Sequence, residues 1–155
     1  MARQSNTNIN TIGRSKITTP SLELNSDNGS VLISIARGEE IEFGWTFNWI
    51  TGTTVLGTSP IMTIVEGNNA GSGIPTSPQD GGVRTDIVMT YTAGTDPQRY
   101  VAEIPRTLTD SWTNGPTPGV PVYGFFGIEV TDGEQLWKPV KGLVEIIYSA
   151  TYTAP

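Results

Sequence analysis

The residue types that carry out much of protein chemistry are missing from this chain, which has neither histidine nor cysteine among its 155 residues. Without cysteine, a disulfide framework and a thiolate metal site are excluded. Without histidine, the commonest general base and the commonest transition-metal ligand are excluded as well. A zinc enzyme or a Ser-His-Asp hydrolase is therefore ruled out, and we expect no catalytic site, no metal site and no cofactor.

Three short patterns could still suggest chemistry, and each has a simpler structural interpretation. Glu39, Glu40 and Glu42 are closely spaced carboxylates of the kind that act in glycoside hydrolysis. Alternation along a strand, however, places Glu40 and Glu42 on a solvated face. The Gly-Ser-Gly segment from Gly71 lacks the lysine of a phosphate-binding loop. The Asp-Gly-Glu segment from Asp132 has too few acidic ligands for a calcium loop and is typical of a turn.

Charge divides the chain into a basic beginning and an acidic remainder. The net charge of −6 argues against nucleic-acid binding, because affinity for phosphates comes from clustered Lys and Arg. Up to Pro20 the only charged side chains are Arg3, Arg14 and Lys16. Residues 1–30, rich in Asn, Ser and Thr, are predicted to form an extended arm with no core of its own. Either this arm is a solvated tail, or a partner orders it and these three bases bind that partner.

From residue 31 to residue 155 the sequence predicts one all-β domain. The strongest signal is a β-hairpin, in which alternation places Phe126, Ile128 and Val130 on one face. The chain then reverses at Asp132-Gly133, and the return strand is expected from Lys141 onward.

Alternating or β-branched segments predict further strands at residues 31–35, 41–49, 61–65, 83–91 and 99–104. A long loop rich in Gly and Pro is expected at 66–82, and one helical turn at 105–112. About seven strands with these turn signals are typical of an immunoglobulin-like antiparallel β-sandwich. Five side chains should be buried between its sheets: Trp45, Phe47, Phe126, Ile128 and Ile146.

Three segments carry a family resemblance. The Arg37-Gly-Glu-Glu-Ile-Glu-Phe segment, the Gly124-Phe-Phe-Gly-Ile-Glu-Val-Thr-Asp-Gly segment and the Lys141-Gly-Leu-Val-Glu-Ile segment together resemble small immunoglobulin-like sandwich domains of tailed-bacteriophage structural proteins. The similarity spans residues 31–148. Such domains occur in capsid decoration proteins and in baseplate modules of tails.

The resemblance implies a non-enzymatic virion protein, made in the host cytoplasm. In the first hypothesis it is a decoration or cement protein that binds the major capsid protein, or another virion structural protein, and forms a homo-oligomer. No membrane partner is expected, because no apolar run is long enough to span a bilayer and the first residues do not resemble a signal peptide.

Two alternatives remain open at this point. The first is a tail or baseplate adaptor that uses the same fold. The second is a carbohydrate-binding module, in which an exposed Trp112 or Trp137 would stack on a sugar ring. Trp112 is also the one candidate partner-binding residue that lies outside residues 1–30.

Overall fold

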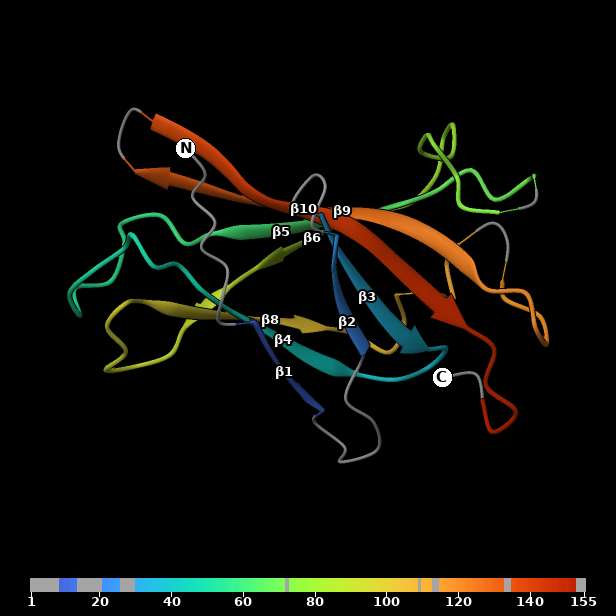
Figure 1. Ribbon diagram of the computed structural model, residues 1–155, viewed down its shortest axis with the longest axis horizontal. Helices are drawn as coiled ribbons and strands as arrows, with labels where there is room; N and C mark the ends of the chain where they lie inside the picture. The colour runs from blue at the N-terminus through green and yellow to red at the C-terminus, as the bar shows by residue number, and fades with distance from the viewer. Residues whose placement is uncertain are drawn as a thin grey trace.

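The computed structural model is an all-β protein with its strands arranged in two facing sheets (Figure 1). It describes residues 9–13, 21–25, 30–71, 73–108, 110–112, 115–132 and 135–152, and these contain ten strands and no helix. The predicted β-sandwich is therefore confirmed, with more strands than the seven that were expected.

The two sheets differ in size. The strand order in the four-stranded sheet is β1 (Ile9–Gly13), β4 (Ile41–Thr46), β8 (Arg99–Ile104), β7 (Thr90–Tyr91). The order in the six-stranded sheet is β2 (Ser21–Asn25), β3 (Ser30–Ala36), β10 (Gln135–Ile147), β9 (Val122–Asp132), β5 (Ile61–Glu66), β6 (Arg84–Val88). Neighbouring strands are antiparallel except β3 and β10, which are parallel. This pair corrects the expectation of a wholly antiparallel fold, and the long chain between the two strands makes the parallel arrangement possible.

β9 and β10 form the predicted hairpin, which is longer than expected. Their pairing extends to Asp132 and Gln135. The return strand thus begins at Gln135 rather than near Lys141. The register shifts just before Val140, next to Pro139, which has no backbone N–H to give to a ladder. A bulge at this proline lets β10 continue where a regular strand would have ended.

The core lies between the inner faces of the two sheets. Phe43 of β4 meets Phe126 of β9 edge to face, with ring centroids 5.9 Å apart, and this contact joins the sheets. All five side chains that the sequence predicted to lie between the sheets are buried: Trp45, Phe47, Phe126, Ile128 and Ile146.

The strand predicted over residues 41–49 ends early. β4 stops at Thr46, and the N–H of Phe47 donates to the carbonyl of Gln98 at 2.9 Å. The N–H of Ile50 donates back to the carbonyl of Phe47 at 3.0 Å, so the chain turns here. Phe47 remains in the core, whereas Trp49 is only half-buried.

The strand predicted over residues 83–91 is in fact two strands that belong to different sheets. β6 is the edge of the six-stranded sheet and β7 is the edge of the four-stranded sheet. Met89 lies between them, is buried, and donates its N–H to the carbonyl of Pro60 at 2.8 Å. The alternation continues through Met89, which is why the sequence pattern did not reveal the change of sheet.

Two strands lie within the segment predicted to be an arm without a fold of its own. β1 pairs with β4, with Ile9 opposite Trp45, and β2 pairs with β3, with Leu22 opposite Ile33. The free edges of β4 and β3 provide backbone hydrogen-bonding partners that an isolated segment lacks. These described parts of the arm therefore belong to the sandwich.

Candidate functional site

The outer face of the six-stranded sheet carries a row of apolar side chains that crosses four neighbouring strands. Leu32 of β3 lies opposite Leu143 of β10, Leu143 lies opposite Phe125 of β9, and Phe125 lies opposite Val65 of β5. All four are half-buried, while the residue that follows each of them in its strand is buried. We call these four residues the outer apolar row. A sheet face that is apolar on its solvent side is typical of a surface that binds something.

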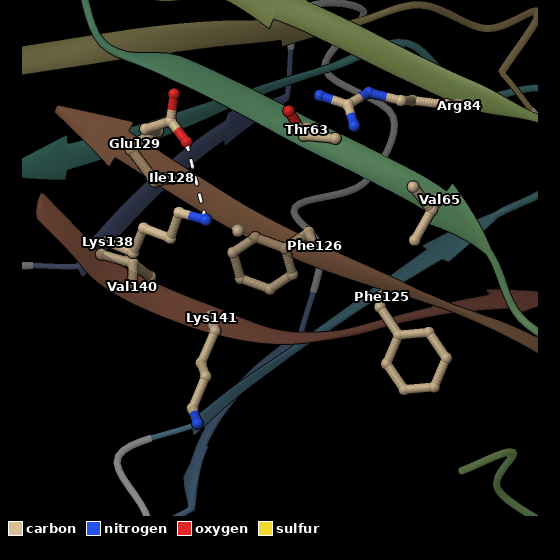
Figure 2. Close-up of a pocket in the computed structure, with 11 residues that line it drawn as sticks. Thr63, Val65, Arg84, Phe125, Phe126, Ile128, Glu129, Lys138, Val140 and Lys141 are labelled. Atoms are coloured by element: carbon tan, nitrogen blue, oxygen red, sulfur yellow. Dashed lines mark ion pairs between the residues drawn. The ribbon is translucent and has the colours of Figure 1, made fainter. Parts of the chain in front are cut away.

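A groove lies beside this row, and Gly127 is among the residues that line it. Its volume is about 300 Å³, and Phe125, Thr63 and Lys141 are among the residues that line it (Figure 2). A Cβ atom at Gly127 would meet only the carbonyl oxygen of Val140, at an ordinary contact distance of 3.6 Å. The groove therefore exists because one position of the outer face has no side chain.

The rim of the groove is cationic. Arg84, Lys138 and Lys141 line it, and among the described residues Glu129 is the one carboxylate that does so. After Pro20 the chain has six bases and fifteen acids, so half of these bases surround this one groove. The described lining of the groove therefore carries more positive than negative side chains, whereas the chain as a whole has a net charge of −6.

The cations of the rim differ in how they are paired. The Lys138 ammonium lies 3.9 Å from Glu129, as the dashed line in Figure 2 marks; Lys138 is largely exposed, whereas Glu129 is half-buried. Arg84 lies 3.1 Å from Asp86. The pKa of Asp86 is lowered chiefly by the hydrogen bond from Thr63, with Arg84 adding to the effect. Lys141 is exposed, and no described residue forms an ion pair with it. It is the cation most available to a ligand.

A polar row lies on the other side of the outer apolar row. The hydroxyls of Ser34 and Tyr123 donate to the two carboxylate oxygens of Glu145, at 2.7 and 3.0 Å. Burial, followed by the bond to Glu145, raises the pKa of Tyr123. Since both oxygens of Glu145 accept hydrogen bonds, this carboxylate connects β3, β10 and β9 rather than facing a substrate.

The loop predicted at 66–82 is fastened to the end of β9. The side-chain amide of Asn69 donates to the carbonyl of Tyr123 at 3.0 Å, and its oxygen accepts the N–H of Tyr123 at 2.8 Å. Glu66, which is buried, accepts the N–H of Val83 at 3.2 Å. The side-chain amide of Asn69 thus pairs with both backbone groups of Tyr123, as a residue of a neighbouring strand would, and adds one pairing to the sheet.

A second polar cluster connects Tyr152, at the end of the described chain, to Arg37 and Asp110. Arg37 lies 3.6 Å from Asp110, and its guanidinium stacks over the Tyr152 ring at 4.3 Å. The Tyr152 hydroxyl donates a hydrogen bond to Asp110, which raises the pKa of Tyr152. Asp110 lies where one helical turn was predicted. The segment instead makes two successive turns, and in the second the Asp110 N–H donates to the Thr107 carbonyl at 3.1 Å.

Of the four predicted partner-binding residues, only Trp112 lies among the described residues. Arg3, Arg14 and Lys16 lie outside the described residues. The prediction that Trp112 is exposed is wrong, because only 6% of its surface is accessible. Its ring covers Gly124, where a Cβ atom would come within 2.6 Å of it. Trp112 therefore fills a gap left by a missing side chain, which does not suit it to stacking on a sugar.

Sequence reasoning missed the outer apolar row and the groove. A signal was present, since Phe125 and Phe126 are adjacent, and adjacent strand residues face opposite sides of a sheet. Leu32 and Leu143 likewise stand beside buried core residues. Apolar residues on both faces of the same strands could have predicted a second apolar surface, but the position of the cations around Gly127 depends on the strand order.

No protein-family model, no curated protein and no solved structure matches this chain. Among the described residues, no group of three or more acidic side chains is placed to hold a metal ion. The described part of the chain also has no helix that could cross a membrane.

Proposed function

We propose that this chain is a non-enzymatic structural protein that binds to the surface of a larger protein assembly. The observation that carries the proposal is the outer apolar row beside a groove with a cationic rim. An apolar surface of this kind is stabilised when a partner covers it, and the surrounding charges select which partner does so.

The assembly we propose is a tailed-phage virion, with this chain as a capsid decoration or cement protein. The support is the resemblance of residues 31–148 to immunoglobulin-like domains of phage structural proteins, together with a rigid sandwich that offers one broad sheet face. A protein that binds only the assembled shell stabilises that shell in proportion to its affinity. The tail adaptor remains the second candidate, because the same face could bind a tail protein. The burial of Trp112 removes one of the two tryptophans on which the carbohydrate-binding alternative relied.

The test is to count copies of the chain on purified particles of the phage that encodes it. Quantitative mass spectrometry and imaging of labelled protein give the number and the position. Hundreds of copies on the head, with particles that rupture at a higher temperature than particles lacking the protein, are the expected result. A handful of copies at the tail would favour the adaptor, and complete absence from particles would refute both.

A further inference from the structure

We infer that the groove over Gly127 binds an extended acidic segment of the partner protein, with one large apolar side chain inserted beside Phe125 and with carboxylates placed on Lys141, Lys138 and Arg84. This inference rests on the proposed function and specifies its docking surface. Its first basis is shape. A volume of about 300 Å³ is at the lower end of the range for ligand pockets, so it suits one side chain better than a whole cofactor.

The second basis is charge. Three cations and one carboxylate line a groove on a protein whose net charge is −6. Lys138 is paired only at 3.9 Å and Lys141 has no ion-pair partner among the described residues, so both can contact a new carboxylate without breaking a strong contact. Complementary charge of this kind steers an acidic partner to the groove and disfavours a basic one.

Other occupants fit less well. A two-fold contact between two copies would place the same cations of each copy against one another, which is repulsive. A nucleic acid needs more phosphate contacts than three cations supply, and it would be repelled by the acidic remainder of the surface. An acidic protein segment uses both the cations and the outer apolar row, whereas each of these alternatives uses only one.

The experiment uses the full chain and defined probes. Three fluorescently labelled hexapeptides each carry one phenylalanine and have glutamate, glutamine or lysine at all other positions, and fluorescence polarisation measures their binding at low and physiological salt. NMR follows the backbone amide of Gly127. We expect the glutamate peptide to bind at least tenfold more tightly than the other two, to weaken with salt, and to shift the Gly127 signal.

Two variants and a control locate the site. Lys141→Glu changes an exposed side chain and should weaken binding of the glutamate peptide at least fivefold, and Gly127→Leu should fill the groove and abolish binding. Arg106→Gln removes a positive charge from the exposed loop after β8 and should leave binding unchanged. Equal binding of the three peptides, no shift at Gly127, or an equal loss with Arg106→Gln would each overturn the inference. Self-association that Gly127→Leu removes would overturn it in favour of a second copy.

Particle binding separates this inference from the proposed function. If Lys141→Glu and Gly127→Leu still decorate particles at full occupancy, the groove is not the docking surface although the proposed function stands. If the unmodified chain is absent from particles but binds the glutamate peptide at Gly127, the groove assignment stands and the virion proposal fails.

Discussion

Replacing each of two adjacent phenylalanines with alanine should have very different effects on stability. Phe126 is 4% exposed and contacts Phe43 across the sandwich, whereas Phe125 lies half-buried on the outer face. Truncating a buried phenylalanine removes its transfer free energy and leaves a cavity, at a cost of about 3 to 5 kcal/mol. Phe125 is only half-buried, so Phe125→Ala should lose about half of the free energy that burying a core side chain contributes. This loss is about 1 kcal/mol.

Urea unfolding, followed by tryptophan fluorescence, measures the difference directly. Domains of this size are stable by about 5 to 15 kcal/mol, so Phe126→Ala should remove about a fifth or more of the stability of a typical domain. With a slope of about 2 kcal/mol per molar urea, its midpoint should fall by about 2 M, and that of Phe125→Ala by about 0.5 M. The two variants remove the same atoms from neighbouring positions, so each is the control for the other.

The reasoning would be refuted by a cost below about 1 kcal/mol for Phe126→Ala, since a core contact between the sheets cannot be so weak. An equal cost for the two variants would also refute it, because it would mean that both faces of β9 are buried. In that case the outer apolar row would not be available to any partner.

Three further predictions concern other contacts. Asn69→Ala removes hydrogen bonds to both backbone groups of Tyr123 and should cost about 1 to 3 kcal/mol, with faster hydrogen exchange at the Tyr123 amide; unchanged exchange would contradict the pairing. Trp112→Ala should cost about 3 to 5 kcal/mol, and a cost near zero would mean that the ring is exposed after all. The pKa of Tyr152 lies above its ordinary value of 10.0 in the folded state because its hydroxyl donates to Asp110. The stability from this contact should therefore be complete below pH 10 and be lost as the pH rises through the raised pKa. Urea unfolding of Tyr152→Phe and of the unmodified chain at a series of alkaline pH values measures this loss, and an identical pH dependence of the two would contradict it.

Local patterns in the sequence determined much of the fold. The alternation around Phe126 and the Asp132-Gly133 dipeptide were enough to predict a hairpin, since both depend on contacts between residues that are near in sequence. The inner-facing side chains were also predictable, because the two-residue period of a strand assigns each residue to a face. For the same reason the sequence alone was sufficient to place Trp45, Phe47 and Ile146 in the core.

The tertiary structure alone decided what depends on strand order. Nothing near Met89 in the sequence indicates that the chain changes sheets there, and nothing near Trp112 indicates that Gly124 leaves a gap for its ring. β1 and β2, which lie within residues 1–30, pair with β4 and β3, and a local sequence pattern cannot specify such distant partners.

The same limit applies to the candidate site. Leu32 and Leu143 are separated by most of the chain, and only the parallel pairing of β3 with β10 makes them neighbours in one row. The cations of Arg84 and Lys141 reach one groove because β5 and β9 lie between their strands in the sheet. A sequence determines which face of a strand is apolar through its two-residue period, but only long-range pairing decides which of those faces lie side by side and form a surface.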